Sequence, residues 1–142
     1  MKFHKALFPV DLEDVATAEH ALKYLKETLR SDQKLYLLSV MPGMNMPLVA
    51  SYFPEGAIEN AISVMRHQLE TLASQVLGGD VDYEVLVEEG KPHNLIIETA
   101  KRLDCDLIAM PSRNHSLLEK VLIGSVTAKV VEQAECSVYV MR

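Results

Sequence analysis

The sequence predicts an α/β protein with an open, five-stranded parallel sheet and helices on both faces. Two observations lead to this prediction. Five short apolar runs alternate along the 142-residue chain with longer segments of helical periodicity. Strands separated by helices need crossover connections, which make the strands parallel and place the helices on the faces of the sheet. Because no repeat, low-complexity tract or linker interrupts this order, residues 1–142 are predicted to form one domain.

The predicted strands are apolar runs bounded by Asp, Gly, Pro or charged residues. They are residues 5–10, 35–40, 81–87, 106–110 and 137–141. The third run places Val or Tyr at every second position, as a half-buried strand does. Pro9 lies inside the first run, and we expect it near the end of that strand because proline cannot donate to a ladder in a central strand.

The first two predicted helices each carry an apolar stripe at a spacing of three or four residues. The stripe of the first is Val15, Ala18, Leu22, Leu25 and Leu29. The stripe of the second is Ile58, Ile62, Met65, Leu69, Leu72 and Val76. The second helix is expected to end at Gly78-Gly79, because glycine is the usual residue after a helix.

The third and fourth predicted helices have recognisable starts. Pro92 opens the third, where a missing N–H costs nothing, and the fourth begins near Ser125. Their expected inward residues are Ile96, Ala100 and Leu103 in the third and Val126, Val130 and Ala134 in the fourth. Residues 41–54 are too long for a simple turn and are interpreted as a loop, over the carboxyl edge of the sheet or packed on the surface or on a partner subunit.

Composition excludes several classes of protein. With 49% hydrophobic and 24% charged residues the chain is globular rather than disordered, and a net charge of −6 argues against a general nucleic-acid binder. No apolar run is long enough for a membrane span or a secretory leader, so a cytoplasmic location is expected. Cys105 and Cys136 are expected to be buried, reduced thiols, and no Cys or His spacing predicts a metal site.

Polar residues gather where the predicted strands end, which is where open parallel sheets bind ligands. Asp11 follows the first strand, and its carboxylate suits an adenine amino group or a ribose hydroxyl, or a helix cap. Arg113 and His115 follow the fourth strand and supply positive charge or hydrogen-bond donors. Gly124-Ser125 opens the last helix, whose N–H groups and dipole favour phosphate, although such a pair also serves as a plain N-cap.

Three stretches resemble the universal stress protein family. Residues 110–127 (MPSRNHSLLEKVLIGSVT) resemble the signature G-x2-G-x9-G-[ST] that follows the family's fourth strand. Residues 6–11 (ALFPVD) resemble its first strand and aspartate, and residues 136–141 (CSVYVM) resemble its last strand. The stretch 86–90 also fits, so the resemblance covers essentially the whole chain. It implies a Rossmann-like fold of the adenine nucleotide alpha hydrolase-like kind.

The resemblance implies a regulatory stress-response protein that binds ATP or another adenine nucleotide, with Mg²⁺ accompanying the phosphates. It implies no catalytic residue and at most slow ATP hydrolysis. The candidate nucleotide-binding residues are Pro9, Val10, Asp11, Val40, Met110, Ser112, Arg113, Asn114, His115, Gly124, Ser125 and Val126.

Two glycines of the family signature are replaced in this chain, by Pro111 and Asn114. Proline offers no N–H to a phosphate, and its ring intrudes where glycine allows close approach. Asn114 is a milder change, because asparagine tolerates a left-handed backbone and can donate a hydrogen bond. The alternative function is therefore a homodimeric interaction module that binds no nucleotide.

Both readings include a homodimer, since in the family the last strand commonly pairs with its twin. Val138 and Val140 are then expected at or near the interface, and the protein partners are unknown. Other α/β classes fit less well. A receiver domain needs an aspartate after strand three, where Glu88-Glu89-Gly90 stands. A dinucleotide-binding domain needs G-x-G-x-x-G after strand one, where residues 11–14 read DLED, and a P-loop is absent.

Overall fold

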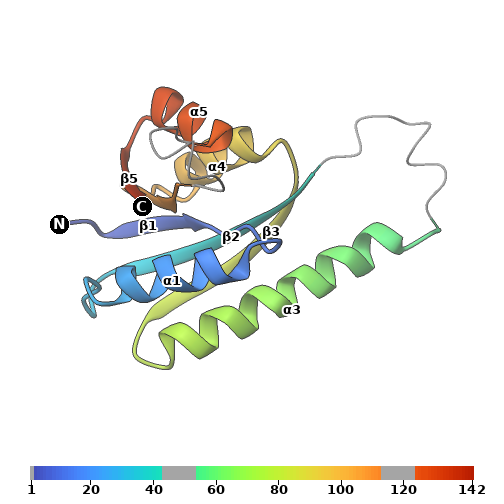
Figure 1. Cartoon of the computed structure of the whole chain (residues 1–142), viewed down its shortest axis with the longest axis horizontal. Coiled ribbons are helices and arrows are strands. Elements are labelled where there is room, and N and C mark those ends of the chain that lie inside the picture. The colour runs from blue at the N-terminus through green and yellow to red at the C-terminus, as the bar shows by residue number, and fades with distance from the viewer. Residues whose placement is uncertain (1, 43–53, 113–123) are drawn as a thin grey trace.

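The computed structural model describes residues 2–42, 54–112 and 124–142 and confirms the predicted fold class. Its elements are β1 (Lys5–Pro9), α1 (Val15–Lys26), β2 (Lys34–Pro42), α3 (Ala57–Leu77), β3 (Asp82–Gly90), α4 (Pro92–Arg102), β4 (Leu107–Pro111), α5 (Ser125–Gln133) and β5 (Ser137–Met141). The five strands form one parallel sheet in the order β3-β2-β1-β4-β5. Helices α1 and α3 cover one face, and α4 and α5 cover the other (Figure 1).

Two apolar clusters hold the helices to the sheet, and the central strand β1 contributes to both. Phe8 points into the cluster under α1 and α3, where Leu22 and Leu69 are also fully buried. Leu7 points to the opposite face and packs in the cluster under α4 and α5, which includes Ile108 and Val130. This alternation is the period of two that a strand buried on both faces imposes. Within the described ranges, no helix is both long and apolar enough to span a membrane.

Strand boundaries differ from the sequence prediction mainly on the β2–β3 side. β1 ends at Pro9, so the proline takes the expected position at a strand end. β2 runs on to Pro42, and Met41 pairs with Glu89 of β3. The prediction that the long loop begins at residue 41 was therefore wrong for its first two residues, while residues 43–53 lie outside the described residues. The sequence prediction ended the third strand at residue 87, before the acidic pair Glu88-Glu89. β3 continues to Gly90, because charged side chains do not stop an outer strand from pairing.

Helix ends also refine the prediction. Val15 is 42% exposed and Leu29 follows the end of α1, so only Ala18, Leu22 and Leu25 of that stripe form its buried face. α3 ends at Leu77 with Gly78 as its C-cap, whose positive φ of 67° is a backbone that glycine adopts more readily than other residues. α4 begins at Pro92 and α5 at Ser125, as predicted.

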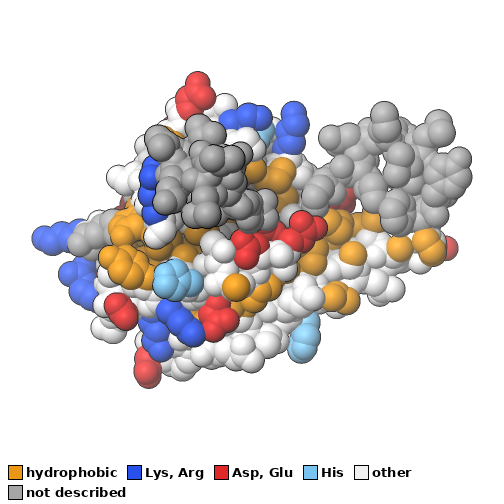
Figure 2. All heavy atoms as spheres, in the orientation of Figure 1, with side chains coloured by type: hydrophobic (Ala, Val, Ile, Leu, Met, Phe, Trp, Pro, Cys, Tyr) orange, Lys and Arg blue, Asp and Glu red, His pale blue; other side chains and the backbone are white. Residues whose placement is uncertain are grey.

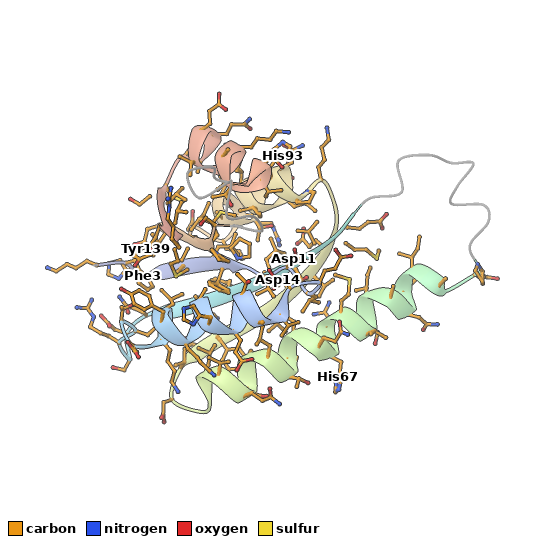
Figure 3. All side chains as sticks on the ribbon, viewed as in Figure 1. Phe3, Asp11, Asp14, His67, His93 and Tyr139 are labelled. Carbon is orange, nitrogen blue, oxygen red and sulfur yellow. The ribbon has the colours of Figure 1, made fainter. Side chains whose placement is uncertain are left out.

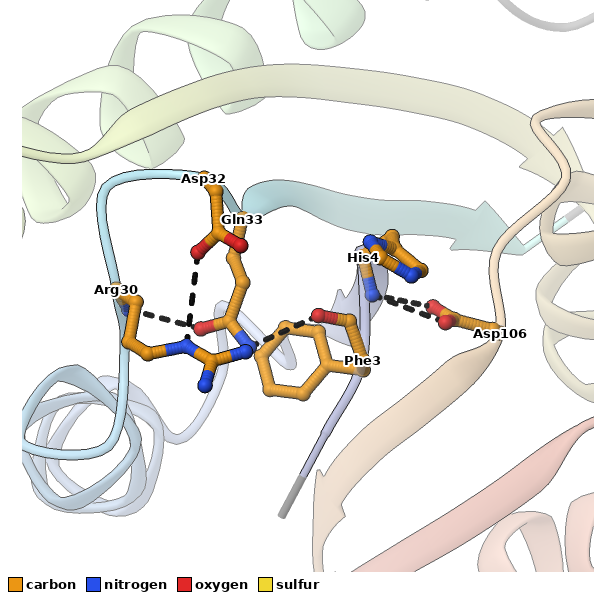
Figure 4. Close-up of polar contacts among 6 residues, drawn as sticks. All are labelled: Phe3, His4, Arg30, Asp32, Gln33 and Asp106. Atoms are coloured by element: carbon orange, nitrogen blue, oxygen red, sulfur yellow. Dashed lines mark hydrogen bonds and ion pairs between the residues drawn. The ribbon is translucent and has the colours of Figure 1, made fainter.

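The amino-terminal residues are tied to two distant turns (Figure 4). The Asp106 carboxylate, just before β4, accepts hydrogen bonds from the backbone N–H of His4 (2.9 Å) and of Lys5 (2.9 Å). The buried Gln33 side chain donates to the Phe3 carbonyl (2.8 Å) and accepts from the Arg30 N–H (2.8 Å). Burial opposes ionisation of Asp106, but the backbone hydrogen bonds outweigh it, so its pKa is lowered.

Replacing Asp106 with alanine is expected to lower the free energy of unfolding by about 1 kcal/mol at pH 7. The effect is modest because this carboxylate is exposed and water can replace it. Since the folded-state pKa is depressed, the stabilisation is present above the unfolded pKa of about 3.9 and is lost as pH falls through the folded value. Urea denaturation should therefore show a difference at pH 7 that shrinks below about pH 4. The exposed Asp80 is the control, and an equal loss in Asp80→Ala would contradict this account.

Candidate functional site

The strand order reverses between β1 and β4, which makes their carboxyl ends the switch point of the sheet. The paired register of these two strands is Ala6↔Leu107 and Leu7↔Ile108. Beyond it, the N–H of Val10 donates to the Leu38 carbonyl in β2 at 2.8 Å. Because backbone donors alternate sides along a strand, the nitrogen of Pro9 faces β4 and has no hydrogen to give. The proline thus ends the β1–β4 ladder where a ligand crevice would open.

Among the described residues at the carboxyl ends of β1 and β4, several backbone positions have no N–H group or already donate it to a neighbouring strand. The N–H of Val10 is used by β2, and that of Ser112 donates to the Met141 carbonyl at 2.7 Å. Pro9 and Pro111 have none. Further donors among the described residues are the N–H groups that open α5, whose N-cap is Gly124. Gly124 makes no side-chain cap, so the first N–H groups of α5 have no capping side chain at that position.

Asp11 lies two residues after the end of β1 and is exposed (Figure 3). Its Oδ1 accepts from the Glu13 N–H at 3.0 Å, and its carbonyl accepts from the Asp14 N–H at 3.0 Å. The N-cap of α1 is Asp14, whose Oδ1 accepts from the Thr17 N–H at 3.4 Å. The helix-cap alternative for Asp11 is therefore wrong, because Asp14 has that role. Figure 2 shows acidic side chains gathered over the start of α1.

The apolar candidates divide between the two faces of the sheet. Met110 is buried in the cluster under α4 and α5, and Val40 and Val126 pack against that cluster. Val10 is buried on the opposite face, in the cluster under α1 and α3. The structure therefore places three apolar candidates on the face where α5 begins. They can form the apolar wall of a base-binding crevice there.

Three candidates, Arg113, Asn114 and His115, lie outside the described residues. Ser112 is described and is 9% exposed at the end of β4. Gly124 and Ser125 stand at the start of α5, as predicted. In residues 2–42, 54–112 and 124–142, no group of three or more His, Cys, Asp or Glu side chains is placed to hold a metal ion.

A pocket of about 470 Å³ near this edge was missed by the sequence analysis. Its walls are one side of α1 (Thr17, His20, Ala21 and Tyr24) and the ends of β4 and β5 (Pro111, Ser112, Tyr139, Val140, Met141 and Arg142). A hydrogen bond with Tyr24 raises the pKa of Tyr139. The pocket touches the predicted site through Pro111 and Ser112 but is not lined by Asp11, Val40 or Gly124. The 3,4 spacing of Thr17, His20 and Tyr24 was the available signal, since it puts all three on one helix side.

The fold and its switch point define a doubly wound α/β protein with its candidate site at the carboxyl edge of the sheet. The chain belongs to the universal stress protein family, whose model matches residues 2–142. This agrees with the resemblance carried by the first strand, the last strand and the Gly124-Ser125 step.

Several relatives and solved structures match along nearly the whole chain. Universal stress protein MJ0531 of Methanocaldococcus jannaschii is 28% identical over 99% of this chain and 82% of its own length. The structure of MJ0577 from the same organism superposes with a TM-score of 0.80 at 25% identity, over 99% of this chain and 96% of that one. A universal stress protein in complex with cAMP superposes with a TM-score of 0.64 at 19% identity, over 100% and 98%. One from Archaeoglobus fulgidus in complex with dAMP has a TM-score of 0.61 at 17% identity, over 100% of both chains.

Proposed function

We propose that this chain is a cytoplasmic, regulatory stress-response protein that binds ATP or a related adenine nucleotide at the carboxyl edge of its sheet. The observation that carries the proposal is the meeting of three features at the switch point. An exposed carboxylate, Asp11, follows β1. The apolar Val40, Met110 and Val126 share one face. The start of α5 at Gly124 presents N–H groups at the same edge.

Each part of a nucleotide has a matching group. Asp11 accepts a hydrogen bond from the adenine amino group or a ribose hydroxyl, and the apolar side chains pack against the base. In the proposed complex Ser112, Gly124 and Ser125 surround the phosphates. Asn114, Arg113 and His115, which lie outside the described residues, are proposed to supply hydrogen bonds and positive charge to them. Mg²⁺ would accompany the nucleotide through its phosphates. Adenine, a pentose sugar and phosphate occur in both cAMP and dAMP, the ligands of two proteins that share this fold.

Millimolar ATP-Mg²⁺ is expected to raise the thermal midpoint of the purified protein by several degrees. A ligand at 100 times its Kd adds about 2.7 kcal/mol of stability, and for a chain of this length each kcal/mol moves the midpoint by about 2–5 °C. The increase should disappear in Asp11→Ala and persist in Glu13→Ala, which removes an exposed carboxylate from the same turn. Each variant is compared with its own nucleotide-free midpoint. An equal increase in Asp11→Ala would contradict the role given to Asp11.

The second candidate is a homodimeric interaction module without nucleotide. It is favoured by Pro111, which offers no N–H, and by the Ser112 N–H, which β5 already uses. The outer position of β5 in the sheet suits pairing with a twin strand, with Val138 and Val140 at or near the interface. The absence of any ATP-dependent increase in the wild type, together with a dimer in solution, would put this function first.

A further inference from the structure

The two cysteines of the chain occupy equivalent places at the amino ends of neighbouring strands. Cys105 follows α4 and comes two residues before β4, and Cys136 follows α5 and comes directly before β5. β4 and β5 are paired in register, beginning with Leu107↔Ser137. Extended by one residue, this register sets Cys136 opposite Asp106, the neighbour of Cys105 in the chain. The two cysteines are therefore one position out of register, at the end of the sheet opposite the candidate nucleotide site.

The backbone around Cys105 is fixed by the turn that ends α4. Asp104 has a φ of 54°, and its N–H donates to the Lys101 carbonyl at 3.1 Å. The Cys105 N–H donates to the Ala100 carbonyl at 2.8 Å. These two bonds form the Schellman arrangement that closes a helix. Cys105 thus has a defined position relative to α4 and β4.

Both cysteines line one pocket of about 340 Å³. Cys105 is buried in the cluster under α4 and α5, and Cys136 packs against that cluster and is half-buried. The pocket also includes Lys101 and Glu135, whose ion pair (3.0 Å) joins α4 to the turn before β5. No bond joins the two sulfurs in this structure, since both cysteines are free.

The surroundings keep both thiols protonated at neutral pH. Burial, with a smaller contribution from the neighbouring Cys136, raises the pKa of Cys105 to about 11. Burial, together with the charge of Asp106, also raises the pKa of Cys136. Because the thiolate is the reacting species, the pair reacts slowly at pH 7 and faster as the pH rises. The two thiols are therefore expected to be oxidised by sustained exposure to an oxidant rather than by a brief one.

We propose that Cys105 and Cys136 are a modification site, a dithiol that closes to an intramolecular disulfide in an oxidising thiol pool. The more exposed Cys136 thiolate attacks a low-molecular-weight disulfide, forms a mixed disulfide and releases one thiol. The Cys105 sulfur then attacks Cys136 Sγ and releases the second thiol. Two protein thiols and one small disulfide become one protein disulfide and two small thiols. Neighbouring parallel strands lie about 4.8 Å apart and rise about 3.3 Å per residue, so an offset of one residue gives a Cα separation of about 6 Å, within the range of about 4.4–6.8 Å that a disulfide needs.

The bond would close a loop from residue 105 to residue 136 that contains β4 and α5. It would join the two turns at the amino ends of β4 and β5 and leave the carboxyl edge open. Oxidation is therefore expected to stabilise the fold without occupying the nucleotide site. This proposal does not depend on nucleotide binding.

The test is an equilibrium measurement on the full chain in buffers of reduced and oxidised glutathione at pH 8. Samples are quenched with acid, unfolded, treated with a maleimide and weighed by intact mass spectrometry. The intramolecular disulfide appears as protein that takes up no maleimide until it is reduced, and peptide mapping assigns it to Cys105 and Cys136. The same titration in 8 M urea gives the equilibrium constant for the unfolded chain.

We expect the folded chain to favour the disulfide at least tenfold more than the unfolded chain. Cys105→Ser and Cys136→Ser should each show only a mixed disulfide with glutathione or a free thiol. A folded-to-unfolded ratio of one or less would overturn the proposal. Disulfides between two chains in place of the internal bond would overturn it equally.

Discussion

Replacing Gly90 with alanine is expected to lower the free energy of unfolding by about 2–4 kcal/mol. Gly90 is the last residue of β3 and has a φ of 150°, a conformation that other residues rarely adopt. An added Cβ would lie 2.8 Å from Leu95 Cδ1 and 3.3 Å from Leu95 Cγ, in the first part of α4. The Leu95 side chain can move aside in part, so backbone strain carries most of the cost. Urea denaturation measures this loss directly.

The matched control is Gly79→Ala, at the turn after α3. A Cβ at Gly79 meets no atom within 4 Å, and no left-handed φ is required there. This variant is expected to be neutral or stabilised by up to about 1 kcal/mol, because alanine restricts the unfolded chain. Equal stabilities of the two variants would show that Gly90 is not under conformational constraint.

Replacing Gly124 with valine is expected to abolish the increase in thermal midpoint produced by ATP-Mg²⁺, which corresponds to a loss of about 100-fold or more in affinity. Gly124 is the N-cap of α5, with φ −57° and ψ 155°, a backbone that valine adopts without strain. The branched side chain would fill the space before the first N–H groups of α5, where the proposed site holds the phosphates. Isothermal titration with ATP measures the affinity itself.

Two comparisons make the Gly124 result interpretable. Valine is a poor N-cap and costs about 1 kcal/mol of stability, so each variant is compared with its own nucleotide-free midpoint. Gly79→Val makes the same substitution in open space at the far end of α3 and should keep the full response to ATP. An unchanged affinity in Gly124→Val would remove the start of α5 from the site.

Much of the fold was predictable because the spacing of apolar residues within a single helix or strand reveals that element without knowledge of its neighbours. The buried stripe of α1 and the stop at Gly78 follow from local spacing and glycine chemistry. The end of β2 was not predictable, since Met41 is a strand residue through its pairing with Glu89. Asp106 is another case, because its partners lie about a hundred positions earlier in the chain.

The candidate site was predictable where the type of residue and its position at the end of a strand or the start of a helix together indicate its location in the fold. Asp11 and Gly124 stand where the sequence placed them, after β1 and before α5. The cap of α1 was ambiguous, because two aspartates three positions apart are equally suited, and the structure uses Asp14. The pocket beside α1 was missed although Thr17, His20 and Tyr24 share one side of the helix, because that spacing does not show that the ends of β4 and β5 form the opposite wall.

Three strands of this sheet, β1, β2 and β4, have proline as their last residue, at positions 9, 42 and 111. A terminal proline prevents the ladder from lengthening on the side that its nitrogen faces, because that nitrogen has no proton, whereas Val10 and Ser112 still donate to the strand on the other side. Insertions or deletions beyond these prolines should therefore not propagate into strand alignment. Loops grafted from a relative at this edge should therefore leave the sheet and its core intact.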